Sequence, residues 1–230
     1  SLIRGLAHEV KNPLGGIRGA AQLLERALPE NELREYTNVI ISEADRLRDL
    51  VDRMLGPWQP MQFAPVNLIE VIERVIHLLK GEFYSDLQWQ RDYDPSLPQV
   101  QGSKDQLIQA ILNIARNACQ ALQQSKHARI VFKTRVVRQF TIGSVRHRQI
   151  MHLSITDNGP GIPVDLIDRI FFPMISGRNE GSGLGLSISQ NIVGQHGGTL
   201  QVVSRPGNTE FSVYLPFSSP NIPSEAKELI

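Results

Sequence analysis

The sequence predicts an α+β protein in which an antiparallel helical hairpin precedes an α/β sandwich, with helices on one face of a mostly antiparallel sheet. Two observations lead to this fold class. Apolar residues between positions 2 and 55 recur at alternating steps of three and four, which is helical spacing. Beyond position 63, helical and strand patterns follow one another without the strand–helix–strand alternation of a parallel fold. We therefore divide the 230 residues into a hairpin (1–56), a hinge (57–62), a mixed domain (63–217) and a polar tail (218–230).

The hairpin is expected to contain two long helices. The first covers residues 2–28 and ends before Pro29, and the second begins near residue 33. An apolar seam with the spacing of a bundle interface follows the first helix at Leu6, Val10, Pro13, Ile17, Ala20, Leu24 and Ala27. One hairpin cannot bury the stripes of both helices, whereas two hairpins form a four-helix bundle, so the sequence predicts a homodimer. The segment Gly56-Pro57-Trp58-Gln59-Pro60 then breaks the second helix and predicts a hinge.

The mixed domain is expected to contain three longer helices and five strands. Helices are predicted at 66–80, at 103–123 and from the glycine-rich segment 157–185 to about residue 196. Ser103-Lys-Asp-Gln106 has the pattern of a capping box at the start of the second of these helices. Strands are predicted at 87–93, 128–137, 147–156, 199–204 and 209–216, and the last four of them form two hairpins.

Composition excludes several classes of function. A formal net charge of +1 gives no reason to expect nucleic acid or an anionic membrane as a partner. The single cysteine, Cys119, excludes an internal disulfide, is expected to be buried, and fits a reducing compartment. The six histidines show no zinc-binding spacing with it. No apolar run approaches ~18 residues, so we expect no membrane segment and a cytoplasmic location.

The first candidate site lies on the first helix. His8 is two residues from Leu6 and two from Val10, so it points away from the seam. Asn12 shares its face one turn later, and Glu9 lies about 100° round the helix. An exposed imidazole beside a carboxylate is suited to act as a nucleophile. A solvated surface histidine is the alternative when this helix is considered alone.

A pair of asparagines marks the second candidate site. Asn113 and Asn117 are four residues apart on the helix 103–123 and therefore face the same way. Their amide oxygens are hard ligands that could hold Mg²⁺ together with the phosphates of a nucleotide. The alternative is that both side chains hydrogen-bond a neighbouring loop.

Two glycine-containing turns complete the set. Asp157-Asn-Gly159-Pro-Gly161 follows a predicted strand, and its carboxylate could accept a hydrogen bond from the exocyclic amine of adenine. Gly181-Ser-Gly183-Leu-Gly185 leads directly into a helix, where backbone N–H groups beside glycines can hold phosphates. No strand precedes this segment and no Gly-Lys-Ser/Thr follows, so it matches neither a Rossmann nor a Walker motif.

The ordered set of motifs resembles that of sensor histidine kinases. A His-Glu-x-x-Asn-Pro helix is followed by Asn-x3-Asn, Asp-x-Gly-x-Gly, a Phe-x-Pro-like segment and Gly-x-Gly-x-Gly, over nearly all of residues 1–217. The resemblance implies a dimeric four-helix bundle followed by an ATP-binding domain of the histidine kinase, gyrase and Hsp90-like type. Segments 8–16, 91–98 and 172–178 resemble the nitrogen-regulation branch of this family, which implies a PII-type signalling protein as a further partner.

The resemblance also implies roles for individual residues. His8 would be phosphorylated by ATP, Glu9 would orient the imidazole and accept its proton, and Asn12 would position water for dephosphorylating a response regulator receiver domain. The resemblance assigns Mg²⁺ to Asn117 and Asn113. It assigns adenine to Asp157, Gly159 and Gly161, and the phosphates to Gly181, Gly183, Leu184 and Gly185. Phe172 and the basic Arg178, in the segment between these two motifs, would also belong to the ATP site.

The sequence departs from the family pattern at one position. Many members carry a basic residue three positions after the second asparagine, where this chain has Gln120, and Arg116 is the expected substitute for a phosphate contact. The basic segment 139–149 has no assigned role. Two alternatives to a kinase remain: an ATPase of the same nucleotide-binding fold, and a non-catalytic dimeric signalling adaptor that binds ATP.

Overall fold

The computed structural model describes residues 2–28, 31–55, 62–83, 87–123, 125–173, 175 and 183–218, with the side chains of residues 2–11, 31, 32, 46 and 48–55 left out of the description. The chain divides into two compact units, Ser1–Pro60 and Met61–Ile230. Because residues 56–61 and 219–230 lie outside the described part, the predicted limits of hinge and tail stay predictions.

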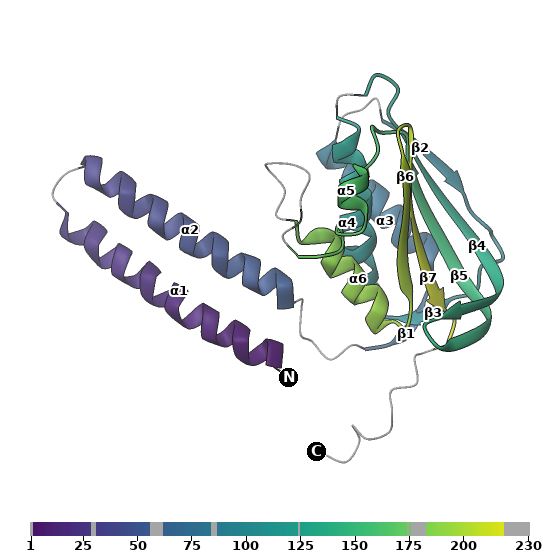
Figure 1. The fold of residues 1–230 in the computed structure, drawn as a ribbon, viewed down its shortest axis with the longest axis horizontal. Coiled ribbons are helices and arrows are strands. Elements are labelled where there is room, and N and C mark those ends of the chain that lie inside the picture. Colours follow the sequence, from purple (N-terminus) through teal and green to yellow (C-terminus); the bar gives the residue numbers. More distant parts are fainter. Residues whose placement is uncertain are drawn as a thin grey trace, which may run out of the picture. The chain divides into compact units, whose positions relative to one another are not determined.

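The first unit is a hairpin of two long helices, α1 (Leu2–Ala27) and α2 (Asn31–Leu55), which run antiparallel (Figure 1). The expected helix limits are therefore close to the observed ones. Within one chain the helices bury Leu14, Ala21, Thr37 and Ala44 against each other. Neither Leu14 nor Ala21, the two of these residues that belong to α1, lies on the predicted seam of that helix, so the seam is not the line along which the hairpin closes.

The predicted seam instead remains open in the single chain. Ile17 is 50% exposed and Leu24 is 51% exposed, although both are large apolar side chains. Among the side chains of α2 that the structure describes, the exposed large hydrophobic ones are Leu33, Tyr36, Val39, Ile40 and Leu47. A helix at the centre of a bundle needs an apolar face wider than one stripe, because it contacts more than one neighbour. The seam is thus a second apolar surface beside the one that the hairpin uses.

The second unit is a sheet covered on one face by helices (Figure 1). The strands lie side by side in the order β2 (Gln88–Asp92), β4 (Arg129–Ile142), β5 (Val145–Asp157), β7 (Asn208–Pro216) and β6 (Thr199–Arg205). Only β2 and β4 pair in parallel, and the other neighbouring strands are antiparallel. The helices are α3 (Leu68–Glu82), α4 (Lys104–Ala121), the short α5 (Val164–Ile167) and α6 (Gly185–Gln195). The expected α+β sandwich with a mostly antiparallel sheet is confirmed.

One hydrophobic core lies between helices and sheet. From α3 it takes residues at helical spacing, such as Val71, Val75 and Leu79, and from the sheet it takes alternate residues, such as Phe132 and Leu153. All five are at most 1% exposed. This core fixes α4 and α6 against the sheet; the asparagine pair lies on α4 and the second glycine-containing turn leads into α6, while the Asp157 turn follows the end of β5.

Two small features were not expected from the sequence. A separate two-stranded sheet pairs β1 (Ala64–Val66) with β3 (Val100–Gly102). The capping box at Ser103 was wrong in detail: α4 begins there, but the Ser103 side chain forms no capping hydrogen bond. Its backbone N–H instead donates to Nε2 of His196, at 3.0 Å. The start of α4 is therefore held by the end of α6.

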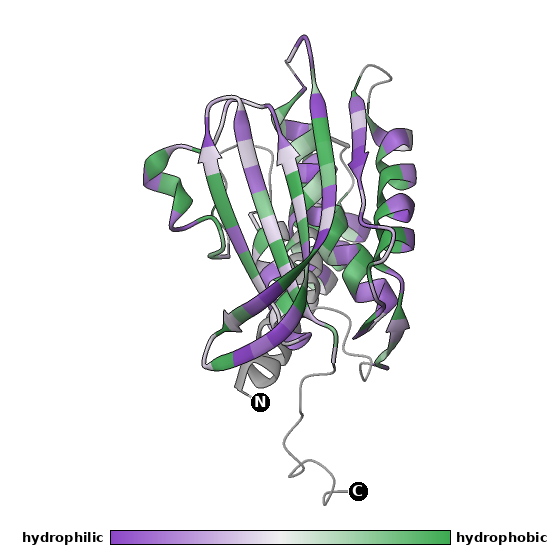
Figure 2. Ribbon diagram, turned by 90° about the vertical axis from the view of Figure 1, so that its right-hand side faces the viewer, coloured by the Kyte–Doolittle hydropathy of each residue, from purple (hydrophilic) through white to green (hydrophobic). Residues whose placement is uncertain are grey.

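The hairpin of β4 and β5 is longer than predicted and bends out of the sheet. The two strands stay paired up to a turn at residues 143 and 144, where Gly143 has a φ of +58°. Its far end turns away from the direction of the other strands (Figure 2). Gln139 has the left-handed φ of +53°, and the Phe140 ring stacks on Tyr214 of β7 with 4.4 Å between ring centroids. The basic segment 139–149 is thus a folded arm of the sheet.

Candidate functional site

The paired asparagines of α4 lie beside the start of α6. Nδ2 of Asn113 donates a hydrogen bond to the carbonyl oxygen of Gly185 at 3.2 Å. Because the amide nitrogen is used in this bond, Oδ1 is the end of the amide left for a cation. Asn117 follows one turn later on the same face, and both side chains are partly buried. The structure therefore brings the asparagine motif and the end of the glycine motif together.

The start of α6 has the conformation needed for an anion site. Gly183 has a φ of +64°, which side-chain-bearing residues rarely adopt, and Leu184 is the N-cap with its side chain buried. Neither of these residues nor Gly185 puts a polar side chain over the helix end, so the free backbone N–H groups are what this end presents. Gly181 lies outside the described residues.

The Asp157 loop follows the end of β5. Asp157 is buried, and its Oδ1 accepts the backbone N–H of Gly159 at 2.9 Å. A Cβ at position 159 would lie 2.7 Å from this oxygen, so the turn requires glycine. Gly161 has a φ of +88° and packs against the backbone of Arg205 and Pro206, where a Cβ would come within 3.0 Å. Both glycines are thus needed by the fold of the loop itself.

This loop is fixed from two sides by residues that the sequence did not single out. On one side the N–H of Gly207 donates to the carbonyl of Gly159, and the N–H of Ile162 donates to Oγ of Ser204, both at 2.8 Å. On the other side Asn158 accepts the N–H of Arg129 at 2.8 Å and donates to the carbonyl of His127 at 2.7 Å. These bonds join residues 29 to 48 positions apart in the sequence, which no local pattern reveals.

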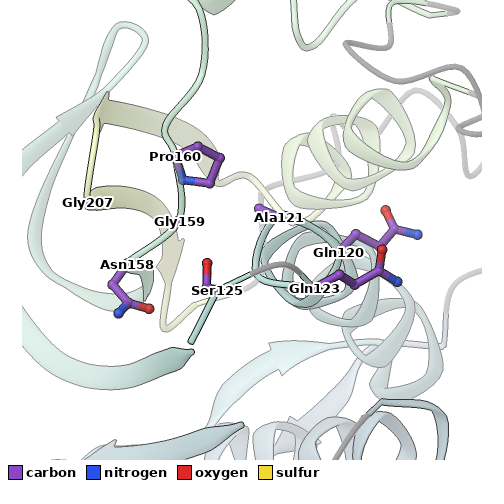
Figure 3. A pocket seen from close by; sticks show the side chains of 8 residues that line it. All are labelled: Gln120, Ala121, Gln123, Ser125, Asn158, Gly159, Pro160 and Gly207. Atoms are coloured by element: carbon purple, nitrogen blue, oxygen red, sulfur yellow. The ribbon is translucent and has the colours of Figure 1, made fainter. Parts of the chain in front are cut away.

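A hollow of about 620 Å³ lies against the loop (Figure 3). It is lined by Gln120, Ala121, Gln123, Ser125, Asn158, Gly159, Pro160 and Gly207. None of these side chains carries a formal charge, and several offer amide or hydroxyl groups. A Cβ at Gly159 would be 3.3 Å from Cβ of Ala121, so the loop touches the last turn of α4. The hollow therefore lies between the end of α4 and the Asp157 loop.

The remaining predicted residues of this domain lie in different surroundings. The guanidinium of Arg116 is paired with the Glu82 carboxylate at 2.8 Å, which places it against the end of α3. Phe172 is 60% exposed in the turns after α5. Arg178 lies outside the described residues. A phosphate contact by Arg116 stays a prediction, as do the roles of the other two.

Cys119 is the one cysteine, and it lies on the buried side of α4. Burial raises the pKa of its thiol to about 12. The expectation that this cysteine is buried is therefore confirmed, and its thiol stays protonated at neutral pH. Among the residues that the structure describes, no group of three His, Cys, Asp or Glu side chains could hold a metal ion. Amide oxygens, such as those of Asn113 and Asn117, are ligands that a hard cation can use together with other oxygen ligands.

Comparison with known proteins shows the same two parts. Residues 102–219 match the family "Histidine kinase-, DNA gyrase B-, and HSP90-like ATPase", and residues 1–56 match the "His Kinase A (phospho-acceptor) domain". The chain belongs to the histidine kinase family. The fold class expected from the resemblance is confirmed, and the second unit of this histidine kinase is an ATP-binding domain.

Individual relatives and structures agree with this assignment. A sensory histidine kinase/phosphatase NtrB from Vibrio alginolyticus is 53% identical over 94% of this chain, which spans 61% of that relative's length. The crystal structure of full-length ShkA in complex with AMPPNP has a TM-score of 0.63 and 25% identity, covering 95% of this chain and 46% of that one. Histidine kinase ThkA in complex with the response regulator protein TrrA has a TM-score of 0.59 and 24% identity, covering 94% and 61%.

The His-Glu-x-x-Asn-Pro motif of this histidine kinase lies near the N-terminal end of α1. The backbone of His8 and Glu9 is helical, while their side chains are outside the description. Asn12, one turn later, is exposed. The helix continues through Pro13 without interruption. No described helix of the chain is long and apolar enough to span a membrane.

Proposed function

We propose that this chain is an ATP-dependent protein-histidine kinase that phosphorylates itself on His8 and passes the phosphoryl group to an aspartate of a response regulator. One observation carries the proposal: α4 is contacted by the start of α6 at Asn113 and by the Asp157 loop at Ala121. Eight residues of helix separate these contacts, which is about 12 Å. That is the distance a nucleotide needs between a base near Asp157 and phosphates near Gly185.

The base would occupy the Asp157 end of the site. The Asp157 carboxylate would accept a hydrogen bond from the exocyclic amine of adenine, in a turn whose glycines keep the backbone compact. The phosphates would bind the N–H groups of Gly183, Leu184 and Gly185, with Gly181, Phe172, Arg178 and Arg116 as further candidates. The two ends of the site therefore differ in chemistry: the adenine amine needs a hydrogen-bond acceptor, and the phosphates need hydrogen-bond donors.

Mg²⁺ would be held by Asn117, with Asn113 in support, together with phosphate oxygens. The donor set fits a hard cation, because amide oxygens are neutral ligands and the phosphates supply the negative charge. Nδ2 of Asn113 donates to the carbonyl of Gly185, so Oδ1 points to the other side of the amide, where it could bind a cation. When bound, Mg²⁺ would neutralise charge that develops on the phosphates during transfer.

The reaction needs a neutral imidazole. A ring nitrogen of His8 with a free lone pair forms the bond to the γ-phosphorus while the bond from phosphorus to the β,γ-bridging oxygen breaks, and ADP leaves. The imidazole loses its other ring proton to Glu9, which also orients the ring. A basic group such as Arg178 would stabilise the charge on the transferring group.

The later steps concern other proteins. The phosphoryl group would pass to a receiver-domain aspartate, and Asn12 would position water when the same kinase dephosphorylates that regulator. The exposed seam at Ile17 and Leu24 supports a homodimer with a four-helix bundle. The similarity to sensory histidine kinase/phosphatase NtrB supports a role in nitrogen regulation, with a PII-type protein as a candidate partner. The kinase itself would act in the cytoplasm.

Incubation with γ-labelled ATP tests the proposal. We expect acid-labile, base-stable label on the protein, and no label on His8→Asn, with ATP binding nearly unchanged in that variant. His77→Asn is the matched control, because His77 is an exposed histidine on α3 and its loss should leave labelling intact.

Other outcomes would contradict the proposal. Full labelling of His8→Asn would exclude His8 as the acceptor. Free phosphate without labelled protein would support an ATPase, although the residues around Asn113, namely Ile111, Leu112, Ile114 and Ala115, supply no catalytic carboxylate. Nucleotide binding with neither product would support a non-catalytic adaptor.

A further inference from the structure

One buried hydroxyl joins the two helices of the nucleotide site. Oγ of Ser189 on α6 lies 3.0 Å from the carbonyl oxygen of Ala110 on α4 and 2.9 Å from that of Gly185 on its own helix. The same Gly185 carbonyl accepts the hydrogen bond from Asn113. Along α4 the contacts advance from Ala110 to Asn113, and along α6 they go back from Ser189 to Gly185. The helices therefore run antiparallel here, with the start of α6 beside the asparagines.

A serine is not what packing alone would place at this position. Ser189 is fully buried, and the other buried side chains of α6 are Ile192 and Val193. Burying a hydroxyl without a hydrogen-bond partner costs free energy of folding. The Ser189 hydroxyl avoids this cost because it donates to backbone carbonyl oxygens of α4 and α6. The hydroxyl thus ties a specific turn of α6 to a specific turn of α4.

A neighbouring serine shows the difference. Oγ of Ser187 donates to the carbonyl of Leu184 at 2.8 Å, within the first turn of the same helix. That bond stabilises α6 but does not connect it to anything else. Of the two serines on α6, Ser189 is the one whose side-chain hydrogen bond crosses to α4.

We propose that Ser189 is a positioning residue, which fixes the spacing between the phosphate-binding start of α6 and the metal-binding asparagines of α4. The inference rests on the proposed function. Without the bond to Ala110, α6 can slide or tilt along α4, and the N–H groups of Gly183 to Gly185 lose their register with Asn113 and Asn117. The base end of the site would be unaffected, because the Asp157 loop is held by Gly207, Ser204 and Asn158 instead.

The test compares ligands that use different ends of the site. In the full chain, we expect Ser189→Ala to raise the Kd for Mg–ADP about 5- to 10-fold, the equivalent of one hydrogen bond. The Kd for adenosine, which lacks phosphates, should stay within about 2-fold of the unsubstituted value. Chemical-shift titration of backbone amides measures both affinities, including millimolar ones. The Mg²⁺ concentration for half-maximal labelling should rise in parallel.

Thr134→Val is the matched control for simple loss of a buried hydroxyl. Thr134 on β4 is as fully buried as Ser189, and its Oγ1 accepts the N–H of Asp94 at 3.0 Å, a bond that involves neither α4 nor α6. This variant should lower thermal stability without changing the ratio of Mg–ADP to adenosine affinity. The ratio therefore separates positioning from a general structural defect.

Two results would overturn the inference. An unchanged Kd for Mg–ADP in Ser189→Ala would show that the bond does not position the phosphate end. An equal loss for adenosine and Mg–ADP would show that Ser189 supports the domain as a whole. If instead the unsubstituted chain fails to bind Mg–ADP at all, the proposed function fails, and that outcome is seen before any variant is compared.

Discussion

The two units of the chain bury their apolar residues to very different extents. In the ATP-binding domain, side chains from three helices and the sheet form a continuous core, and many of them, such as Ile72, Leu79 and Phe132, are fully buried. In the hairpin, large apolar side chains such as Ile17 and Leu24 remain about half exposed, and the buried positions include the small Ala21 and Ala44. The domain has a core of its own, as expected of an independent folding unit. The hairpin instead exposes apolar side chains of the kind that a second subunit can cover.

This difference separates the two halves of the proposed reaction. A domain with its own core can keep Asp157, Asn117 and the start of α6 in register whether or not a partner is present. In the proposed homodimer a second copy would cover the seam of the hairpin, so we expect the helical structure of the hairpin to depend on protein concentration. We therefore expect the nucleotide site to form within one chain, and the proposed phosphoacceptor site at His8 to require the dimer.

Phe132→Ala is expected to have the largest effect, and it should act on the domain alone. Phe132 is fully buried and its ring lies 6.2 Å from that of Trp89, so truncation leaves a cavity in the core. Such substitutions lower the free energy of unfolding by about 3–5 kcal/mol. Segment-resolved hydrogen exchange should show faster exchange throughout 64–216 and unchanged exchange in the hairpin.

Phe140→Ala provides the contrast within the domain. Phe140 stacks on Tyr214 at the open face of the sheet and lies outside the core. Its loss should change exchange in the β4–β5 arm only. If Phe132→Ala also speeds exchange in α1 and α2, the two units are not independent, and the comparison is wrong.

A substitution in the seam of α1 should have the opposite pattern of effects: it should weaken dimerisation and leave the stability of the ATP-binding domain unchanged. Leu24→Ala removes a side chain that we expect the second subunit to bury, which weakens dimerisation by about 2 kcal/mol per subunit. Analytical ultracentrifugation measures the dimer Kd, and thermal unfolding of the domain should be unchanged. Leu23→Ala is the control, because Leu23 is the next residue on α1, is 68% exposed and lies off the seam. Equal effects of the two variants would contradict a specific interface along the seam.

Helical spacing predicted the hairpin but not which line of residues closes it. Leu14 and Ala21 face α2, while Ile17 and Leu24 lie on the other apolar surface. Both sets recur at steps of three, four or seven, so the pattern indicates an apolar face without saying which neighbour covers each part of it. Only coordinates distinguish the surface used within one chain from the surface left for a second.

The motifs of the nucleotide site were predicted, and their supports were not. Asn113 and Gly185 were singled out from local spacing, and the structure places them in contact. Ser189, Ser204 and Asn158, which hold these motifs in place, form bonds to residues far away in the sequence. A local pattern contains no information on such partners. The same holds for Ser103, whose expected cap is replaced by a bond to His196.

A pH titration should affect the domain more than the hairpin. His196 is buried, its Nδ1–H donates to the carbonyl of Ile192 at 2.7 Å, and its Nε2 accepts from Ser103. Burial lowers the pKa of His196 below its ordinary value of 6.5. The unfolded chain therefore takes up this proton first as pH falls, so stability is complete above pH 6.5 and is lost as pH falls through the lowered pKa.

The size of this effect is about 1.4 kcal/mol for each unit by which the pKa is lowered. Chemical unfolding at pH 7.5 and at lower pH measures it. The pKa of His152 is lowered by burial too, so it contributes in the same direction. His196→Gln should be less stable at pH 7.5 and should lose less stability on acidification. A pH dependence as steep as that of the unsubstituted chain would exclude His196 as a main source.

The smallest effect is expected for an ion pair on the domain surface. Arg91 forms two hydrogen bonds with Glu73, at 2.7 and 3.0 Å, and both side chains are more than a third exposed. Arg91→Gln should therefore lower the free energy of unfolding by less than about 1 kcal/mol. The hydrogen bond from Arg91 lowers the pKa of Glu73, so nuclear magnetic resonance titration of the Glu73 carboxyl should show that pKa rising in the variant.

The hairpin contains a similar pair, which sharpens the comparison. Arg18 on α1 and Asp45 on α2 lie 2.8 Å apart with similar exposure in the single chain. If a second subunit covers the hairpin, this pair becomes buried in the dimer, and breaking a buried pair is more destabilising than breaking an exposed one. Arg18→Gln should thus weaken the dimer by more than Arg91→Gln weakens the domain. Equal losses would mean that the hairpin surface stays open to solvent.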